Sequence, residues 1–248
     1  AVTCAFPAFP YAELAGSPRL AGLLVLDLRL NAIGPEGIEA LASSPHLGRL
    51  AALDPAGTPL GQHLPTPAPD NAWRIALDYW EGVLDEDQQR PLPVARAAIR
   101  RLRANPPPPA QKIAIVHGDY RSGNVMHDGC GGMLAMFDWE MAHLGDPVED
   151  LGWALDPIWD HFEPGRVCGM TDRARALATW ERASGLAIDP RAMRWWSLFN
   201  SVKGRAIWTS AFKTFVDGGH TDPVLGISGW YTAVRQDTII AAQLEAFS

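Results

Sequence analysis

The chain has 248 residues, of which 47% are hydrophobic, so it can bury a substantial core as one large or two small domains. Its net charge of −7 disfavours a nucleic-acid-binding protein, which usually carries a basic surface. No apolar run reaches the roughly 18 residues of a membrane span, and the 3 cysteines, which lack metal-type spacing, favour reduced thiols. These features predict a cytoplasmic protein with neither nucleic-acid nor membrane partners, and they leave the oligomeric state open.

The first 44 residues carry weak patterns. Residues 20–30 are apolar enough for a strand or two short strands, and residues 35–43 have a helical composition. The helical signals become stronger from residue 45. We therefore expect two parts, residues 1–44 and a larger, mainly helical part over residues 45–248.

Two helices are predicted ahead of a polar central stretch. A wide apolar stripe predicts a helix over residues 72–88, and a second follows over residues 93–105. Arg96, Arg100 and Arg103 lie at helical spacing on one face of the second helix. They could form an anion site, but a solvated helix face is the favoured interpretation.

Four helices are predicted beyond the central stretch. The first covers residues 147–161 with Asp146 as its N-cap, and the second covers residues 171–184 and ends at Gly185. The last two cover residues 190–216 and 222–247, so everything from residue 72 on is predicted to be helical except one hairpin. Aromatic residues recur at helical spacing, and a place in the core or in a cleft wall is favoured over an aromatic cage for a quaternary ammonium. These are Trp195, Trp196, Phe199, Trp208, Phe212 and Phe215.

The central stretch has the pattern of a polar loop followed by a β-hairpin. An apolar run over residues 113–116 leads into His117-Gly-Asp-Tyr-Arg-Ser-Gly-Asn124, and a second apolar run over residues 133–137 ends at Asp138. Between them, Asp-Gly-Cys-Gly-Gly at residues 128–132 is a strong turn signal. We therefore predict two paired strands with polar residues at their open end.

The hairpin register suggests a metal site. If the hairpin is symmetric about Gly131, Val125 pairs with Phe137 and Asn124 lies opposite Asp138. Residues that oppose each other across strands lie about 4.5–5.5 Å apart. Oxygens of Asn124 and Asp138 at that separation can share one hard cation.

The same residues resemble the catalytic loop and metal site of the protein-kinase fold. His117-x-Asp119-x-x-x-x-Asn124, a hairpin and then Asp138 follow that layout. With Gly118 after the histidine, the stretch is similar to the aminoglycoside phosphotransferase and choline kinase branch, the phosphotransferase enzyme family. The segment from Leu144 to Trp153, Leu-Gly-Asp-Pro-Val-Glu-Asp-Leu-Gly-Trp, is similar to the kinase-like domains associated with acyl-CoA dehydrogenases. The resemblance covers about residue 45 to the C-terminus.

The resemblance implies an α+β, protein-kinase-like fold, mainly its helical C-terminal lobe with the catalytic hairpin. It also implies a phosphotransferase that uses Mg²⁺ and ATP or GTP to phosphorylate an alcohol group of a small molecule. The acceptor could be aminoglycoside-like or a hydroxyacyl-CoA. The alternative is a catalytically inactive nucleotide-binding module.

Roles for individual residues follow from the same resemblance. Asp119 is the expected catalytic base, or at least the group that orients the acceptor hydroxyl, and His117 is expected to support the loop. Asn124 and Asp138 are the expected Mg²⁺ ligands, with Asn124 also on the nucleotide side. Arg121 could contact a phosphate of the nucleotide, or it could pair with an acidic residue, Glu140 or Asp150.

The resemblance implies two further features in the surroundings of the loop. Asp150 is expected to accept hydrogen bonds from the loop backbone, which is a structural role. The acceptor is expected to bind between the loop and the helices over residues 190–247, against Trp208 or Phe212. Among the aromatic residues, these two are the ones we expect to affect acceptor binding.

The nucleotide-binding lobe is expected to be incomplete. A kinase-like fold normally places a Gly-rich loop, a strand lysine and a helix glutamate before the catalytic loop. Here the first lysine is Lys112, immediately before the catalytic strand, and no Gly-rich loop precedes Pro45. Residues 1–44 are therefore predicted to be a remnant of that lobe with its linker, and weak ATP binding follows. The residues leave open whether the lobe is shortened, missing from this sequence or truly absent.

Overall fold

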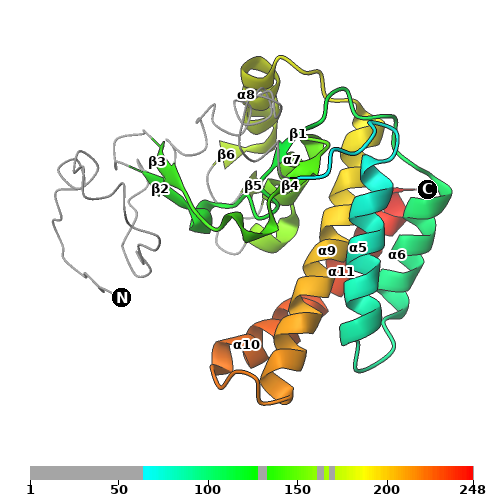
Figure 1. Cartoon of the computed structure of the whole chain (residues 1–248), viewed down its shortest axis with the longest axis vertical. Coiled ribbons are helices and arrows are strands. Elements are labelled where there is room, and N and C mark those ends of the chain that lie inside the picture. The colour runs from blue at the N-terminus through cyan, green and yellow to red at the C-terminus, as the bar shows by residue number, and fades with distance from the viewer. Residues whose placement is uncertain (1–63, 128–132, 161–164, 168–170, 248) are drawn as a thin grey trace, which may run out of the picture.

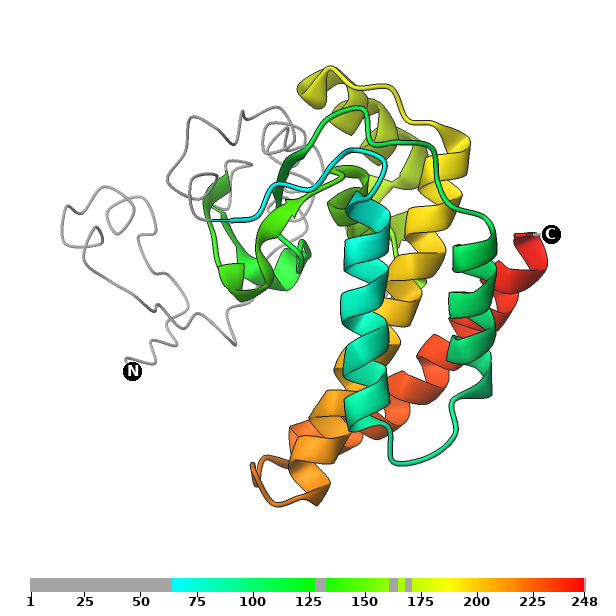
Figure 2. The ribbon, with the colours of Figure 1, turned by 45° about the vertical axis from the view of Figure 1, so that its right-hand side comes forward.

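A helical bundle and a group of short strands make up the described part of the molecule (Figure 1). The computed structural model describes residues 64–127, 133–160, 165–167 and 171–247. The bundle consists of α5 (Ala72–Asp87), α6 (Pro93–Ala104), α9 (Pro190–Val216) and α11 (Ala233–Ala246). Helix α9 packs against the other three and against the short helix α7 (Val148–Ala154), and Figure 2 shows it passing behind α5.

Tryptophan and phenylalanine side chains form the centre of this bundle. Trp195 stacks on Phe199 at 5.4 Å between ring centroids and meets the edge of Trp73 from α5 at 5.7 Å. Its indole N–H donates to the backbone oxygen of Leu102 in α6, at 3.1 Å. Large aromatic side chains bury much apolar area, and such pairs add to that gain. For Trp195 and Phe199, as for Trp196, the core role expected from the spacing is confirmed.

Helices α5, α6 and α9 match their predicted ranges closely. Helix α9 has the predicted bounds, because Asp189 accepts a hydrogen bond from the N–H of Arg191 at 2.7 Å and Pro190 occupies the first turn. Two arginines of α6 pair with acidic side chains of α5: Arg96 with Asp85 at 2.5 Å and Arg103 with Asp78 at 2.6 Å. These pairs favour the helix-face interpretation over an anion site.

One predicted helix is much shorter than expected. Residues 147–161 were expected to form a single helix, but α7 ends at Ala154 and a 3-10 turn, η5 (Pro157–Trp159), follows. A proline disfavours helical backbone in the residue before it, and Asp156 is extended at φ −66° and ψ 130°. Its carboxylate caps the turn by accepting from the N–H of Ile158 at 2.8 Å.

The C-terminal helices begin later than predicted or are interrupted. Helix α8 (Arg173–Ser184) starts two residues after Thr171, because Asp172 is its N-cap, and it ends as predicted at Gly185 with φ 72°. The region over residues 222–247 divides into α10 (Pro223–Ile227), a π-helical turn η6 (Ser228–Thr232) and α11.

Strands are more numerous than the single predicted hairpin. Three two-stranded antiparallel sheets form: β1 (Ala114–Val116) with β4 (His143–Gly145), β2 (Val125–His127) with β3 (Met133–Met136), and β5 (Arg166–Val167) with β6 (Thr171–Asp172). Strands β4, β5 and β6 have two or three residues each, too few for an alternating pattern to reveal them.

The hairpin register differs from the prediction by one residue. Val125 pairs with Met136 rather than Phe137, and the register shifts again at a bulge between Met126 and His127, where His127 pairs with Met133. Asn124 therefore faces Phe137, whose N–H donates to its backbone oxygen at 2.8 Å, and the direct pairing with Asp138 was wrong.

Part of what the sequence predicts lies outside the described residues. This holds for residues 1–44, for the boundary at residue 45 and for the incomplete nucleotide-binding lobe. Within the described ranges, no helix is both long and apolar enough to cross a membrane.

Candidate active site

The loop between β1 and β2 is held by a buried carboxylate from α7. Asp150, which is 2% exposed, accepts from the backbone N–H of His117 at 2.7 Å and of Gly118 at 2.9 Å, one on each oxygen. Burial raises the pKa of Asp150, although these two N–H donors stabilise its charged form. The structural role expected for Asp150 is confirmed.

His117 braces the loop from inside. Its Nδ1 accepts from the backbone N–H of Asp119 at 3.1 Å, so its Nε2 carries the proton and donates to the backbone oxygen of Phe137 at 2.8 Å. The ring is fully buried. His117 therefore links the loop to the residue before Asp138, which agrees with the expected support role.

The Asp119 carboxylate receives hydrogen bonds from three different side chains. Arg121 Nε lies 3.2 Å and 3.0 Å from its two oxygens, Asn124 Nδ2 donates to Oδ2 at 2.7 Å, and Trp153 Nε1 donates to Oδ1 at 2.7 Å. The side chain is 13% exposed, so one edge remains accessible. Sequence reasoning missed the donor Trp153, although it stands in the segment that carries the family resemblance.

Arg121 adopts neither of the acidic partners considered from the sequence. Its guanidinium pairs with Asp119 and lies over the ring of Trp159, 5.4 Å from the ring centroid. Glu140 and Asp150 were wrong as partners. Both oxygens of Asp150 accept hydrogen bonds from the loop backbone, and Glu140 is exposed. A guanidinium stacked on an aromatic ring keeps a charged fork close to an exposed edge of the site.

Asn124 and Asp138 flank the loop with oxygen atoms suited to a hard cation. Asn124 is 5% exposed, and its Nδ2 donates to the Asp119 backbone oxygen at 2.9 Å and to the Asp119 carboxylate, so Oδ1 is the atom that could face a cation. Asp138 is exposed, and its carboxylate has no hydrogen bond or ion pair with any described residue.

These two residues fit a cation that takes its other ligands from elsewhere. In the described ranges no group of three or more His, Cys, Asp or Glu side chains could hold a metal. A Mg²⁺ ion usually keeps one or two protein ligands and completes its shell with water and substrate phosphates. Two oxygen donors, from Asn124 and Asp138, agree with this coordination pattern and not with a site in which the protein supplies every ligand.

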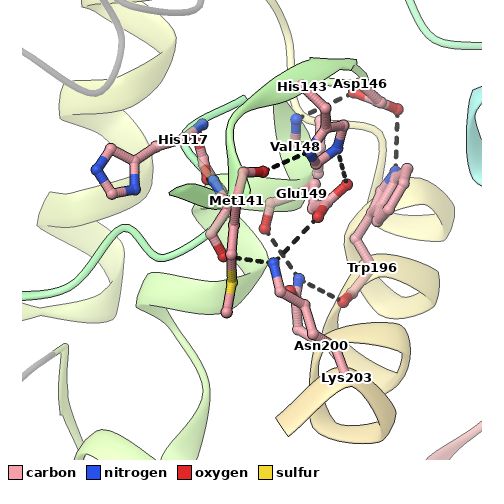
Figure 3. Close-up of polar contacts among 11 residues, drawn as sticks. His117, Met141, His143, Asp146, Val148, Glu149, Trp196, Asn200 and Lys203 are labelled. Carbon is pink, nitrogen blue, oxygen red and sulfur yellow. Dashed lines mark hydrogen bonds and ion pairs between the residues drawn. The ribbon is translucent and has the colours of Figure 1, made fainter. Parts of the chain in front are cut away.

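A buried ion pair lies beneath the loop (Figure 3). Lys203 of α9 and Glu149 of α7, both nearly inaccessible to solvent, are 3.2 Å apart, and the Lys203 ammonium also donates to the backbone oxygen of Gly118. His143 Nε2 lies 3.1 Å from the second Glu149 oxygen. The loop is thus held through its N–H groups by Asp150 and through a carbonyl by Lys203.

The charges of this cluster support one another. Burial alone would raise the pKa of Glu149, but His143 and Lys203 outweigh it and hold the pKa at about 2. Burial alone would lower the pKa of His143, but Glu149 outweighs it and raises the pKa. Sequence reasoning assigned none of these three residues to the site, and the only signal was a lysine among the apolar and aromatic residues of α9.

The start of α7 is fixed against α9 at the same level. Asp146 caps α7 by accepting from the N–H of Val148 at 3.0 Å, as predicted, and it accepts from Trp196 Nε1 at 3.0 Å. Burial raises its pKa to about 6. Asn200 donates to the backbone oxygens of Glu149 at 2.9 Å and of Trp196 at 2.8 Å, which ties the two helices together.

A row of tryptophans leads from the Asp119 carboxylate to α9. Trp153 meets Trp159 at 5.2 Å between centroids, and Trp159 meets Trp208 at 6.4 Å. Phe212, which the sequence grouped with Trp208, packs instead against Gly229 of the π-helical turn. Only Trp208 of that pair is connected to the loop by aromatic contacts.

Comparison with known proteins gives one family match. The model of the phosphotransferase enzyme family matches residues 24–196, which is more than half of the chain. Among curated proteins, acyl-CoA dehydrogenase family member 11 of Gallus gallus is 32% identical over 82 residues, which cover 33% of this chain and 11% of that protein. The match therefore spans only a small part of that relative.

Two solved structures share the fold. A Ralstonia eutropha JMP134 protein described as an aminoglycoside phosphotransferase superposes with a TM-score of 0.70 at 21% identity, covering 91% of this chain and 70% of that one. A macrolide 2'-phosphotransferase type I gives 0.55 at 18% identity, covering 84% of this chain and 64% of that one. The predicted fold class, a kinase-like helical lobe with a catalytic hairpin, is confirmed.

Proposed function

The chain belongs to the phosphotransferase enzyme family, and on that premise we propose that it transfers the γ-phosphate of ATP or GTP to a hydroxyl of a small molecule. The observation that carries this proposal is the Asp119 carboxylate, which is partly accessible and held on a loop that Asp150 and Lys203 fix from opposite sides. Phosphoryl transfer depends mainly on positioning and charge neutralisation, which is what a rigid loop of this kind provides.

Asp119 acts on the acceptor. Its carboxylate accepts the hydroxyl hydrogen of the acceptor and orients the oxygen toward the γ-phosphorus. A new bond forms between that oxygen and phosphorus, the bond from phosphorus to the bridging β–γ oxygen breaks, and the nucleoside diphosphate leaves. The hydroxyl proton passes to Asp119 and then to solvent.

Asn124 and Asp138 would hold the cation, through Oδ1 and a carboxylate oxygen respectively. Mg²⁺ bound there supplies charge neutralisation for the phosphates of the nucleotide. In the structure Asn124 also donates from Nδ2 to Asp119. One side chain would therefore couple the position of the cation to that of the catalytic carboxylate.

Arg121 would exchange partners during the reaction. It occupies the Asp119 carboxylate in the structure, at 3.0 Å from Oδ2. A guanidinium binds phosphate oxygens with the same fork that it offers to carboxylates. We assign Arg121 to the transferred phosphoryl group, so that its departure exposes Asp119 as the nucleotide arrives.

The acceptor would lie against the tryptophan row beside the loop. Two acceptor classes remain in the proposal, aminoglycoside-like molecules and hydroxyacyl-CoA. The second rests on the segment ending at Trp153 and on the similarity to the acyl-CoA dehydrogenase relative. The test is release of nucleoside diphosphate from Mg-ATP or Mg-GTP with a panel of both classes, with the Asp119→Asn variant as the blank.

A catalytically inactive nucleotide-binding module is the second candidate. The observation that favours it is that Arg121, Asn124 and Trp153 all donate to the Asp119 carboxylate, which leaves few positions for an acceptor hydroxyl. Such a module would bind the nucleotide without acceptor-dependent release of nucleoside diphosphate. The same assay, combined with calorimetric titration of Mg-ATP, separates the two.

Replacing Asp138 by Asn is expected to weaken Mg²⁺-dependent nucleotide binding by at least about tenfold. Asn keeps the shape of the side chain and tolerates the backbone at φ 67°, but it removes the charged ligand. Calorimetric titration of nucleotide with and without Mg²⁺ measures the effect. Asp172→Asn is the matched control, because an Asn caps α8 as well as an Asp does. Unchanged Mg²⁺ dependence would contradict the ligand role.

Trp208→Ala is expected to raise the acceptor KM by about tenfold or more, while the nucleotide KM stays within about twofold. Trp208 supports Trp159, which lies beside Arg121 and Trp153 at the mouth of the site. Phe212→Ala is the control and should leave both KM values unchanged. A larger effect of Phe212 on the acceptor, or of Trp208 on the nucleotide, would place the acceptor elsewhere.

A further inference from the structure

One turn of α7 presents two side chains to the catalytic loop. Asp150 and Trp153 are three residues apart, so they lie on the same face of the helix. Asp150 binds the loop backbone, and Trp153 Nε1 donates to Asp119 Oδ1 at 2.7 Å. We propose that Trp153 is a positioning residue, which holds the Asp119 carboxylate in the orientation that receives the acceptor hydroxyl. This inference rests on the proposed function.

Trp153 is held rigidly enough for this task. Its side chain is 1% exposed, and its ring lies between the edge of Trp159 at 5.2 Å and the ammonium of Lys203, 5.1 Å from the ring centroid. Its own backbone oxygen accepts from Trp159 Nε1 at 3.0 Å. The indole ring is therefore fixed in position, and its N–H sets the orientation of the Asp119 carboxylate.

The close approach of α7 to α9 explains the glycine before Trp153. A Cβ atom at Gly152 would lie 2.6 Å from Asn200 Nδ2 and 3.1 Å from the Trp196 backbone oxygen. A side chain there would force the two helices apart and move Trp153 away from the loop. The sequence Asp150-Leu-Gly-Trp153 can thus be understood as one unit: backbone anchor, close packing and carboxylate donor.

The acceptor positions of the Asp119 carboxylate show how Trp153 could orient it for the acceptor hydroxyl. A carboxylate offers about four acceptor positions. Trp153 takes one on Oδ1 and Asn124 takes one on Oδ2, while Arg121 Nε bridges both oxygens. When Arg121 moves to the phosphoryl group, Trp153 and Asn124 still fix the plane of the carboxylate. The positions that Arg121 leaves become the ones that receive the acceptor hydroxyl.

Trp153→Phe tests this role, because it keeps a large aromatic ring and removes the N–H. We expect kcat to fall by about tenfold or more, while the KM values for nucleotide and acceptor stay within about twofold. A residue that only supported the fold would lower the amount of active enzyme or raise KM. A normal kcat in folded Trp153→Phe, or a loss confined to KM, would overturn the proposal.

Trp196→Phe is the matched control. Trp196 is also 1% exposed. It donates its indole N–H to a buried carboxylate, that of Asp146, at 3.0 Å. That carboxylate caps α7 and makes no hydrogen bond with the loop. The control should lose a similar amount of stability and keep kcat within about twofold.

A second measurement does not depend on activity. Among the indole N–H resonances of the 15N-labelled chain, the Trp153 resonance is identified by its loss in Trp153→Phe. Asp119→Ala should shift this resonance and leave that of Trp196 in place. If Asp119→Ala is folded and its Trp153 resonance has an unchanged chemical shift, the inference is overturned. If the resonance shifts but no acceptor is phosphorylated, the proposed function fails and the contact stands, so the two failures are distinguishable.

Discussion

Asp119→Asn is expected to lower kcat by roughly 10²–10⁴-fold, the range that a general base contributes, while the Kd of Mg-nucleotide stays within about twofold. All three side-chain partners of Asp119 are donors: Arg121, Asn124 and Trp153. An amide in this place meets one of them with its own N–H, and it can no longer accept the acceptor proton. The loss therefore falls on the chemical step.

The measurement combines acceptor-dependent release of nucleoside diphosphate with calorimetric titration of Mg-nucleotide. Asp172→Asn serves again as control, since it makes the same chemical change at an exposed helix cap. The thermal midpoint of both variants reports whether the fold survives. If Asp119→Asn keeps a tenth of the wild-type turnover, Asp119 is not the base.

Lys203→Met is expected to reduce the free energy of unfolding by about 3–5 kcal/mol, which is typical when one partner of a buried ion pair is removed. Methionine fills much of the same volume, so packing changes little. Glu149 then remains buried with His143 as its only basic partner, and the backbone oxygen of Gly118 loses its donor. Urea denaturation measures the change.

The control for this variant is Lys213→Met on the same helix. Lys213 pairs with Asp87 at 3.0 Å, but its side chain is 35% exposed, so its loss should have a much smaller effect. Adding Glu149→Gln to Lys203→Met should recover part of the stability, because the uncompensated charge is gone. A double variant that is less stable than Lys203→Met alone would mean that the cluster is not organised by this pair.

The free energy of unfolding at acidic pH also depends on the cluster of Glu149, His143 and Lys203. The pKa of Glu149 is held at about 2 in the folded protein, below its ordinary value of 4.5. Its stabilising contribution is therefore fully present above about pH 4.5 and is lost as the pH falls from there toward 2. In Lys203→Met the carboxylate loses one of the charges that lower its pKa, so this loss should be smaller.

Several parts of the fold could be predicted because they depend on local chemistry. The limits of α9 follow from Asp189 and Pro190 at its start, and the loop from His117 to Asn124 follows from spacing between two apolar runs. Asp150 could be assigned to the loop backbone because the resemblance extends that far. For α9 and the loop, neighbouring residues in the chain carry the information, whereas Asp150 lies 33 positions from His117 and was assigned through the resemblance alone.

Other parts depend on contacts between distant segments, and these could not be predicted. The pairing of Lys203 with Glu149 joins residues 54 positions apart, and the donation of Trp153 to Asp119 joins residues 34 apart. No local pattern encodes either contact. The hairpin register was wrong for a related reason, because the pairing of the two strands is set by the geometry of both strands rather than by the composition of the turn.

The backbone at Asp138 connects the chemistry of the site with the evolution of its stability. Among the residues that the structure describes, it is the only non-glycine with a positive φ, at 67°. A side chain in that conformation carries a strain of order 1 kcal/mol or more, which glycine would relieve. Selection for thermal stability alone would therefore favour glycine at position 138, and such a protein would be more stable but would lack the carboxylate that we propose as a cation ligand. At position 138, a substitution that raises thermal stability is therefore expected to lower turnover.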